Sequence, residues 1–222
     1  MTSASPSAPV SLIGLVGLKR SGKDTAAQGL VEHLGWRRLA FADPLKEMSL
    51  RLRGVWVEVP DTARMAGIMP LERFTQYYRV IEALGMDQAK ELVPDVRLLL
   101  QTLGTDCVRT TLGTRTWTDL TGNRVRRALD NHENIVLTDV RFGEEMSLVR
   151  ELGGITVGIW RGDTFDVQTA LREPHDEHPS ETTTYELLRQ VDHLVFNNGT
   201  VRDLQQSVIA LVGRNYNPVP FG

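Results

Sequence analysis

The sequence is almost without cysteine and carries little net charge. Cys107 is the sole cysteine among 222 residues, so an internal disulfide is impossible and a cysteine-based zinc site is not expected. The 25 Lys and Arg residues nearly balance the 28 Asp and Glu residues, so the chain lacks the basic stripe that binding to duplex DNA or anionic lipid requires. We therefore expect a protein of the reducing cytoplasm that does not bind nucleic acid directly.

Long apolar segments are also absent. The longest apolar run, residues 12–18, contains two glycines and is far shorter than the about 20 residues that cross a bilayer. Residues 1–11 have neither the basic nor the apolar region of a signal peptide, and we expect them to form a flexible tail. The sequence predicts no contact with a membrane.

Short apolar runs alternate with stretches of helical periodicity over most of the chain. The runs occupy residues 12–17, 36–41, 135–138, 155–160 and 194–196. Strands that alternate with helices in this way predict an α/β fold, in which a parallel sheet is covered by helices on both faces.

A different pattern fills residues 55–130. This stretch has no convincing buried strand and is predicted to be mostly helical. Its helices are expected to break at Pro60, Pro70, Gly85 and Pro94. We interpret it as a helical insertion into a core formed by residues 12–54 and 131–213.

Two further segments are predicted to lie outside the regular elements. Residues 161–180 are polar, rich in charge and without periodicity, so we expect a surface loop or lid within the core. Residues 214–222 are expected to form a C-terminal tail.

The segment from Gly17 to Lys23 carries the strongest functional signal. It matches the pattern G-x-x-x-x-G-K directly after an apolar strand and at the start of a helix. In such a turn, here including Ser21 and Gly22, backbone N–H groups converge on phosphate oxygens and Lys23 reaches the terminal phosphates. Arg20 either adds positive charge beside the phosphates or points to solvent. A basic glycine turn that merely connects strand and helix is the alternative.

The residue after the lysine departs from the general pattern. Asp24 stands where Ser or Thr usually holds Mg²⁺, and Thr25 follows one place later. Two interpretations stay open. Either Asp24 coordinates Mg²⁺ through water while Thr25 donates to a nucleotide phosphate, or Asp24 only complements the positive end of the helix.

Six segments, taken in order, carry a family resemblance. They read GLKRSGKDT, FADPLK, RLLLQTLGTDCVR, LTDVRFGEE, HPSE and DHLVFNNGT. Together they resemble the deoxynucleoside monophosphate kinases encoded by bacteriophages, over most of the chain. The resemblance implies a P-loop kinase fold with a five-stranded parallel sheet, an NMP-binding insertion and a lid. It also implies transfer of the γ-phosphoryl group of ATP to a dNMP with Mg²⁺, in the host cytoplasm if the gene is a phage gene.

Phosphoryl transfer requires donor and acceptor to be held in line and their charge to be neutralised, so arginines near the sheet are candidates. Asp139 and Arg141 follow an apolar strand, at the end where open α/β sheets bind ligands. Asp139 is suited to order Mg²⁺-bound water, and Arg141 to grip the acceptor phosphate or the group in transfer. In the alternative interpretation Asp139 caps the next helix and Arg141 pairs with Glu144 or Glu145.

The resemblance assigns Asp43 and Lys46, which follow the second strand, to the monophosphate pocket. Asp43 before Pro44 is also a common helix N-cap, and the two roles are compatible. Trp117 is the aromatic residue on which we expect a base to stack, although most such residues belong to a core.

Arg97 and Gln101 are four residues apart, so they share one face of a helix. Gln101 can pair with a base edge, and Arg97 with phosphate or base. Arg109 completes a set of polar residues that an apolar core cannot hold without partners. A solvated helix face is the alternative for all three.

Arg161 starts the predicted lid and Arg172 lies within it. Lid arginines in related kinases close over ATP and exclude water, which gives both residues a gating role. Solvated arginines are the alternative. The resemblance places the ATP base at Asn197, Asn198 and Gly199, whose backbone groups or amides can read the adenine edge; a favourable turn without that role is the alternative.

Two other functions stay open at this point. Another small-molecule kinase, of the dephospho-coenzyme A kinase or phosphomevalonate kinase type, shares the style of the loop. A nucleotide-dependent ATPase switch would lack a second substrate pocket. The lid and the insertion favour two-substrate chemistry, so the expected partners are the small molecules ATP and a dNMP. A homodimer and the identity of the base are left open.

Overall fold

The computed structural model describes residues 10–65, 72–162 and 179–213. The chain forms two compact units, of which unit 1 comprises Met1–Phe41 and Thr121–Gly222 and unit 2 comprises Ala42–Leu120. Residues 1–9 of the predicted N-terminal tail, the predicted C-terminal tail, Arg172 and most of the predicted lid lie outside the described residues. Val10, predicted to belong to the N-terminal tail, is buried in an apolar core of unit 1.

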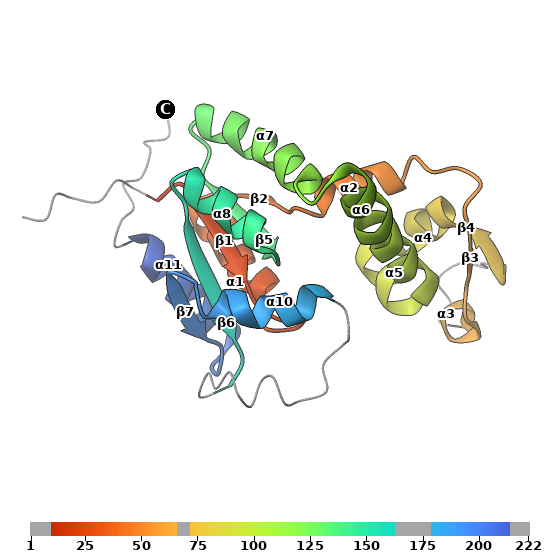
Figure 1. The fold of residues 1–222 in the computed structure, drawn as a ribbon. Coiled ribbons are helices and arrows are strands. Elements are labelled where there is room, and N and C mark those ends of the chain that lie inside the picture. The colour runs from red at the N-terminus through yellow and green to blue at the C-terminus, as the bar shows by residue number, and fades with distance from the viewer. Residues whose placement is uncertain (1–9, 66–71, 163–178, 214–222) are drawn as a thin grey trace, which may run out of the picture. The chain divides into compact units, whose positions relative to one another are not determined.

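Unit 1 contains a five-stranded sheet in the order β2-β5-β1-β6-β7, and every neighbouring pair of strands is parallel (Figure 1). The strands are β1 (Leu12–Val16), β2 (Arg37–Leu39), β5 (Ile135–Val140), β6 (Ile155–Trp160) and β7 (His193–Phe196). Each overlaps an apolar run of the sequence, which confirms the predicted α/β fold with a five-stranded parallel sheet. β1 lies at the centre and is buried along its whole length, as expected of a strand that is covered on both faces.

Helices cover both faces of this sheet (Figure 1). One face carries α1 (Lys23–Leu34) and α11 (Val201–Gly213), and the other carries α7 (Thr116–Asp130), α8 (Gly143–Glu151) and α10 (Pro179–Leu188). Alternate residues of β1 separate the two apolar cores, because Ile13 packs with Leu30 and Leu204 whereas Leu12 packs with Leu148. Burial of one such side chain contributes about 1.5–3 kcal/mol. The predicted covering of the sheet on both faces is confirmed.

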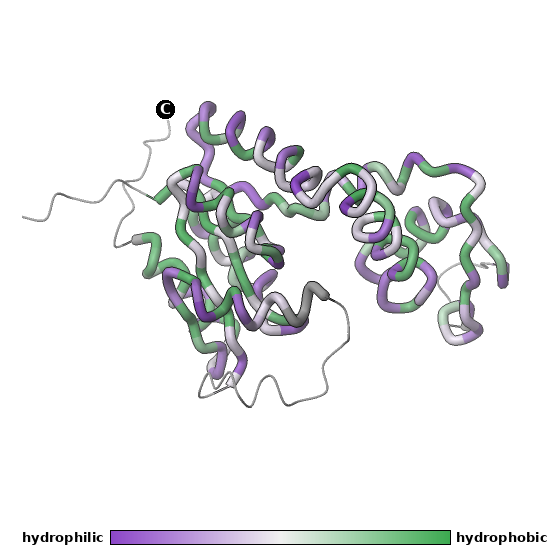
Figure 2. The backbone as a smooth tube through the Cα atoms, in the orientation of Figure 1, coloured by the Kyte–Doolittle hydropathy of each residue, from purple (hydrophilic) through white to green (hydrophobic). Residues whose placement is uncertain are grey.

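Hydrophobic residues concentrate on the strands of unit 1, whereas α7 alternates between hydrophilic and hydrophobic positions (Figure 2). Such alternation suits a helix that packs on a core with one face and meets solvent with the other. No helix within the described ranges combines the length and the apolar character needed to cross a membrane.

The register of the strands brings the ends of β1, β5 and β6 to one edge of the sheet. Val16 pairs with Val140 on one side and with Gly158 on the other. Trp160 at the end of β6 pairs with Phe196 at the end of β7. The segments that follow these strands therefore start at the carboxyl edge of the sheet, where open α/β sheets bind ligands.

Unit 2 is mostly helical, but it also holds a small antiparallel sheet of β3 (Trp56–Glu58) and β4 (Phe74–Gln76). Its helices are α2 (Asp43–Ser49), α3 (Asp61–Met65), α4 (Tyr77–Leu92), α5 (Pro94–Gln101), the π-helix η1 (Thr102–Arg109) and α6 (Thr110–Leu112). The sequence pattern of this stretch indicates no convincing buried strand, and these two short strands were not anticipated from it. Each of the two strands buries only its central residue, Val57 or Thr75, so no apolar run marks them in the sequence.

Two predicted helix breaks occur as expected, at Gly85 and Pro94, whereas the element before Pro60 is the strand β3 and not a helix. Gly85 has φ 72° and kinks α4, and Pro94 starts α5. α3 begins at Asp61, directly after Pro60. The fourth predicted break, Pro70, lies outside the described residues.

The boundaries of unit 2, at residues 42 and 120, differ from those of the insertion predicted at 55–130. The difference arises at both ends. α2 contacts α5 and so joins unit 2, whereas Val125 and Ala128 of α7 pack in an apolar core of unit 1.

Candidate functional site

The turn between β1 and α1 has the backbone that its glycine pattern predicts. Gly22 has φ 107° and Arg20 has φ 63°, both in the left-handed region that favours glycine. A Cβ at Gly17 would lie 2.6 Å from the carbonyl oxygen of Ile159, and a Cβ at Gly22 would lie 2.5 Å from Nδ2 of Asn197. Both glycines are therefore needed for close approach, because the turn packs directly on β6 and on the residue that follows β7.

Lys23 folds back over this turn. Its Nζ donates hydrogen bonds to the carbonyl oxygens of Gly17 and Leu18, each at 2.6 Å. Lys23 is also the first residue of α1, so its charge adds to the positive end of the helix dipole. The ammonium group of Lys23 therefore already lies at the turn where an anion would bind. This position is consistent with the predicted role of Lys23 at the terminal phosphates.

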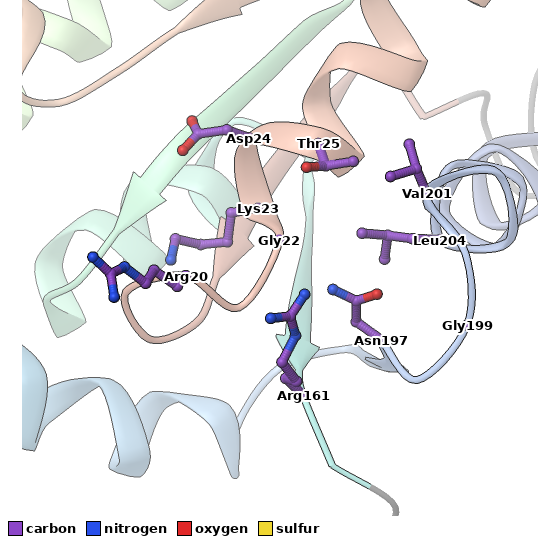
Figure 3. A pocket seen from close by; sticks show the side chains of 10 residues that line it. All are labelled: Arg20, Gly22, Lys23, Asp24, Thr25, Arg161, Asn197, Gly199, Val201 and Leu204. Carbon is purple, nitrogen blue, oxygen red and sulfur yellow. The ribbon is translucent and has the colours of Figure 1, made fainter. Parts of the chain in front are cut away.

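A pocket of about 260 Å³ lies beside the turn, and all of its lining belongs to unit 1. The lining residues are Arg20, Gly22, Lys23, Asp24, Thr25, Arg161, Asn197, Gly199, Val201 and Leu204 (Figure 3). Three of these side chains are cationic and two, Val201 and Leu204, are apolar. This combination suits a ligand with an anionic part and an apolar part, as a nucleotide has.

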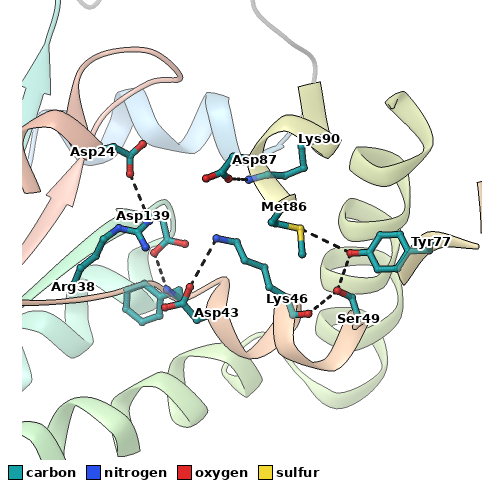
Figure 4. A network of polar contacts seen from close by, with 11 residues as sticks. Asp24, Arg38, Asp43, Lys46, Ser49, Tyr77, Met86, Asp87, Lys90 and Asp139 are labelled. Atoms are coloured by element: carbon teal, nitrogen blue, oxygen red, sulfur yellow. Dashed lines mark hydrogen bonds and ion pairs between the residues drawn. The ribbon is translucent and has the colours of Figure 1, made fainter. Parts of the chain in front are cut away.

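Asp24 and Thr25 both line the pocket, and the Asp24 carboxylate also lies 3.6 Å from the guanidinium of Arg38 on β2 (Figure 4). The Asp24 side chain is 83% exposed, so this ion pair contributes little stability. A carboxylate so exposed can order water around a cation and complement the helix end at the same time. Sequence reasoning missed Arg38, because an arginine on a three-residue strand has no distinguishing pattern.

Ser21 closes the turn and does not line the pocket. Its N–H donates to the carbonyl oxygen of Leu18 at 3.2 Å, and its own carbonyl oxygen accepts a hydrogen bond from Asn197. Its hydroxyl is buried and has no hydrogen-bond partner within the described residues. Ser21 and Gly17 therefore shape the turn, and their contact with ATP stays a prediction.

Asp139 connects two strands at the carboxyl edge of the sheet. Its Oδ1 accepts a hydrogen bond of 2.7 Å from the N–H of Phe41, which follows β2 (Figure 4). The N-cap of α8 is Phe142, so the alternative in which Asp139 caps that helix is wrong. Asp139 precedes Val140, the β5 partner of Val16 at the end of β1. It therefore lies beside the strand that leads into the turn.

Arg141 is held through its main chain. Glu145 is only 3% exposed, and its Oε2 accepts hydrogen bonds from the N–H groups of Arg141 at 2.7 Å and Phe142 at 3.1 Å. The side chain of Arg141 is exposed. The pairing with Glu145 that was kept as an alternative thus involves the backbone. Glu145 itself was missed as a site residue, although a glutamate at the third position of a helix is a recognisable capping signal.

The turn after β7 contacts two other segments of unit 1. Nδ2 of Asn197 donates to the carbonyl oxygen of Ser21 at 2.8 Å, and Oδ1 of Asn198 accepts from the N–H of Gly162 at 3.0 Å. Gly162 directly follows Arg161, whose guanidinium points into the pocket beside Asn197 (Figure 3). The side chains that were expected to read the adenine edge therefore bind the main chain of the protein.

A reciprocal cap fixes the start of α11 beside this pocket. Asp203 accepts hydrogen bonds from the N–H and the hydroxyl of Thr200 at 2.9 and 2.8 Å, and the N–H of Asp203 donates to the Thr200 hydroxyl at 3.2 Å. The hydrogen bonds from the backbone and then from the side chain of Thr200 hold the pKa of Asp203 below its ordinary value. The cap orients the first turn of α11, which contributes Val201 and Leu204 to the pocket.

The first two candidates for the acceptor pocket lie in unit 2. Asp43 and Lys46 form an ion pair of 3.8 Å on α2, with 25% and 26% of their side chains exposed (Figure 4). The sequence predicts Asp43 as the N-cap of this helix. In the structure Ala42 is the N-cap and Asp43 is the first helical residue, so the predicted capping role is wrong. The helix starts earlier because Ala42 already has φ −78° and ψ −9°, close to helical values.

Arg97 and Gln101 both lie on α5, as predicted, and both are half-buried. Arg109 is the last residue of the π-helix η1 and is half-buried too. A π-helix forms i→i+5 hydrogen bonds, so the i, i+4 spacing used in the prediction does not extend from Gln101 to Arg109. Arg97, Gln101 and Arg109 are thus polar side chains that are only partly exposed.

Trp117 is a core residue of unit 2. It is 6% exposed, and its Nε1–H donates a hydrogen bond of 2.8 Å to the carbonyl oxygen of Gly104 in η1. A Cβ at Gly104 would lie 2.7 Å from Cδ2 of Leu45, so η1, α2 and the indole pack closely. The expectation that a base stacks on Trp117 is not supported, because the ring has no exposed face of useful size.

Two comparisons with known proteins decide the family. A profile of deoxynucleotide monophosphate kinases matches residues 69–208. A protein of Acanthamoeba polyphaga mimivirus, provisionally named a deoxynucleotide monophosphate kinase, is 30% identical over 222 residues, which cover 90% of this chain and 95% of that protein. The chain belongs to the deoxynucleotide monophosphate kinase family.

Membership of the deoxynucleotide monophosphate kinase family makes this protein a kinase, and thus a phosphotransferase with nucleotide substrates. It confirms the resemblance carried by the six sequence segments. The relative is a protein of a giant virus, and a bacteriophage origin for this chain stays a prediction.

Solved structures of other kinases are also similar to this chain. Dephospho-CoA kinase from Campylobacter jejuni has a TM-score of 0.48 and 10% sequence identity, over 91% of this chain and 96% of that one. Shikimate kinase from Acinetobacter baumannii has a TM-score of 0.43 and 18% identity, over 95% of this chain and 96% of that one.

Proposed function

We propose that the protein transfers the γ-phosphoryl group of ATP to a deoxynucleoside monophosphate, which yields a deoxynucleoside diphosphate and ADP and so supplies DNA precursors. The observation that carries this proposal is the glycine turn with Lys23 above it, at the mouth of a pocket with cationic and apolar walls. Family membership supports the nucleotide as acceptor.

The donor nucleotide is assigned to the pocket of unit 1. Lys23 and the N–H groups at the start of α1 bind the terminal phosphates, because both present positive charge at the same point. Val201 and Leu204 offer an apolar surface for the base or the sugar. Arg161, which also lines the pocket, can bind phosphate or stack on the base.

Mg²⁺ fits the residues of this site. No group of three or more His, Cys, Asp or Glu side chains within the described residues is arranged to hold a metal ion. Mg²⁺ does not need such a group, since it keeps several waters and binds through one or two carboxylates together with substrate phosphates. We assign Asp24, Thr25 and Asp139 as its oxygen partners. When bound, the ion neutralises phosphate charge.

Charge neutralisation during transfer is assigned to Lys23, Arg161 and Arg141. We expect Arg141→Ala to lower kcat by about 10³ to 10⁵, the range measured for arginines that stabilise a transferring phosphoryl group. Because the side chain is exposed, stability should change little. Arg127→Ala, which removes an exposed arginine of α7, is the matched control, and a loss of less than tenfold in Arg141→Ala would contradict the assignment.

The acceptor is assigned to the partly buried polar residues of unit 2. Lys46 offers a cation for the monophosphate and Asp43 orients it through their ion pair. Arg97 and Gln101 present a guanidinium and an amide from one helix, which suits a phosphate or sugar and a base edge. Arg109 adds a further cation.

The test is a coupled assay of ADP release with ATP and Mg²⁺, run with each of the four dNMPs, with dephospho-coenzyme A, and with no acceptor. Release that depends on a dNMP, together with detection of the dNDP, is the expected result. Release without any acceptor would identify an ATPase, and release with dephospho-coenzyme A alone would identify a different kinase. Either result would overturn the proposal.

A further inference from the structure

Two neighbouring amides at the end of β7 bind the main chain on two sides of the pocket. Nδ2 of Asn197 donates to the Ser21 carbonyl oxygen at 2.8 Å, across 176 residues of sequence. Oδ1 of Asn198 accepts from the N–H of Gly162 at 3.0 Å, across 36 residues. The two side chains thus connect the phosphate turn, the end of β7 and the segment that carries Arg161.

The orientation of both amides follows from the chemistry of their partners. A backbone carbonyl only accepts hydrogen bonds, so Asn197 must present its NH₂ group to Ser21. A backbone N–H only donates, so Asn198 must present its oxygen to Gly162. The two asparagines therefore act in opposite senses, one as a donor and the other as an acceptor.

The Asn197 hydrogen bond controls the direction of a backbone N–H group in the turn. The carbonyl of Ser21 and the N–H of Gly22 belong to one trans peptide plane and point in opposite directions. Fixing the carbonyl therefore fixes the direction of the Gly22 N–H. Gly22 lines the pocket with φ 107°, a region in which glycine is conformationally free. The contact with Asn197 removes that freedom before any ligand arrives.

The Asn198 hydrogen bond acts on Arg161 in the same way. The N–H of Gly162 belongs to the peptide plane that joins it to Arg161, and Gly162 has φ 137°. A second hydrogen bond, from the N–H of Asn197 to the carbonyl oxygen of Trp160 at 2.6 Å, holds the preceding residue. The main chain on both sides of Arg161 is therefore attached to the Asn197–Asn198 turn.

We propose that Asn197 and Asn198 are positioning residues for the phosphoryl donor: Asn197 aims the Gly22 N–H at phosphate, Asn198 orients Arg161, and neither side chain reads the base. This inference rests on the proposed binding of ATP in the pocket of unit 1. It assigns the recognition of the base to other groups. Substitution of Asn197 or Asn198 should therefore leave the ratio of ATP affinity to GTP affinity unchanged.

The first experiment separates phosphate positioning from base reading. Titration calorimetry is run with ATP, GTP and inorganic tripolyphosphate, which differ in the base and share the phosphate chain. Asn197→Ala should weaken ATP and GTP by the same factor of about fivefold to tenfold, the effect of one lost hydrogen bond, and tripolyphosphate by a similar factor. Ser207→Ala, which removes an exposed hydroxyl on α11 that donates to the Asp203 carbonyl oxygen of the same helix, is the control.

The second experiment uses the opposite polarity of the two amides. Asn197→Asp removes the donor to Ser21, whereas Asn198→Asp keeps an acceptor for Gly162, and both add one negative charge at adjacent positions. We expect Asn197→Asp to lose at least as much affinity for ATP as Asn197→Ala. Asn198→Asp should lose less kcat than Asn198→Ala, because the acceptor is restored. Thermal unfolding of every variant shows whether a loss reflects the fold.

The possible outcomes are distinct. If the wild-type protein binds ATP and Asn197→Ala changes the ATP:GTP affinity ratio by more than about threefold, the side chain reads the base and the inference is overturned. Equal losses of ATP affinity in Asn197→Asp and Asn198→Asp would overturn it as well, since the added negative charge alone would explain them. If the wild-type protein binds no ATP, the proposed function fails first and the inference fails with it.

Discussion

The buried carboxylate of Glu145 allows a quantitative test of how the Arg141 segment is held. One oxygen of Glu145 accepts two backbone N–H groups, at 2.7 Å and 3.1 Å, and the residue is 3% exposed. A hydrogen bond to a charged group contributes about 1.5–3 kcal/mol. Removing both in Glu145→Ala should lower the free energy of unfolding by about 3–6 kcal/mol. Glu145→Gln keeps an uncharged acceptor, about half as strong, and should lose about 2 kcal/mol.

Urea denaturation followed by circular dichroism at pH 7 measures these differences. A loss of 1 kcal/mol lowers Tm by about 2–4 °C for a protein of this size, so calorimetric scans give an independent value. Glu151→Ala removes an exposed glutamate at the other end of α8 and should change stability by less than about 0.5 kcal/mol. A loss below about 1 kcal/mol in Glu145→Ala would refute the reasoning, because the two N–H groups would then have found other partners.

Three further predictions follow from single residues. Gly22→Ala should lower ATP affinity by about tenfold to a hundredfold, since φ 107° costs a non-glycine residue about 1–2 kcal/mol and its Cβ would lie 2.5 Å from Asn197; titration calorimetry checks this, and unchanged affinity would contradict it. Trp117→Phe should lower the free energy of unfolding by about 1–3 kcal/mol in urea, because the buried Gly104 carbonyl loses its donor; a similar KM for dNMP in both proteins would confirm that the indole does not bind the base. Asp203→Asn should lower stability at pH 7 and by progressively less as the pH falls through the depressed pKa of Asp203; a stability difference that stays constant from pH 7 to acid would contradict this.

The parts of the fold that the sequence predicts are those with a strong local pattern. The turn from Gly17 to Lys23 is recognisable because its glycines and lysine follow a known phosphate-binding spacing directly after an apolar strand. The buried strands are recognisable as apolar runs. β3 and β4 escaped prediction because each buries a single residue. The π-helix η1 escaped it as well, since its sequence differs little from that of an α-helix.

Most of the candidate site depends on contacts between distant residues, which a single sequence does not reveal. The pairing of Asn197 with Ser21 and that of Asp139 with Phe41 each join segments about a hundred residues or more apart. Trp117 illustrates the limit for aromatic residues, because its burial and its hydrogen bond to Gly104 are visible only in the structure. Residue type and order predicted the nucleotide site, whereas the partners of each side chain required the structure.

Titration calorimetry with ATP and Mg²⁺ tests the central claim most directly, because that claim is that the turn from Gly17 to Lys23 binds the phosphates of ATP. We expect the wild-type protein to bind ATP, Lys23→Ala to bind it at least about tenfold more weakly, and Lys19→Ala, which removes an exposed lysine outside the pocket lining, to bind it like the wild type. Absence of binding by the wild-type protein, or equal binding by Lys23→Ala, would contradict the account.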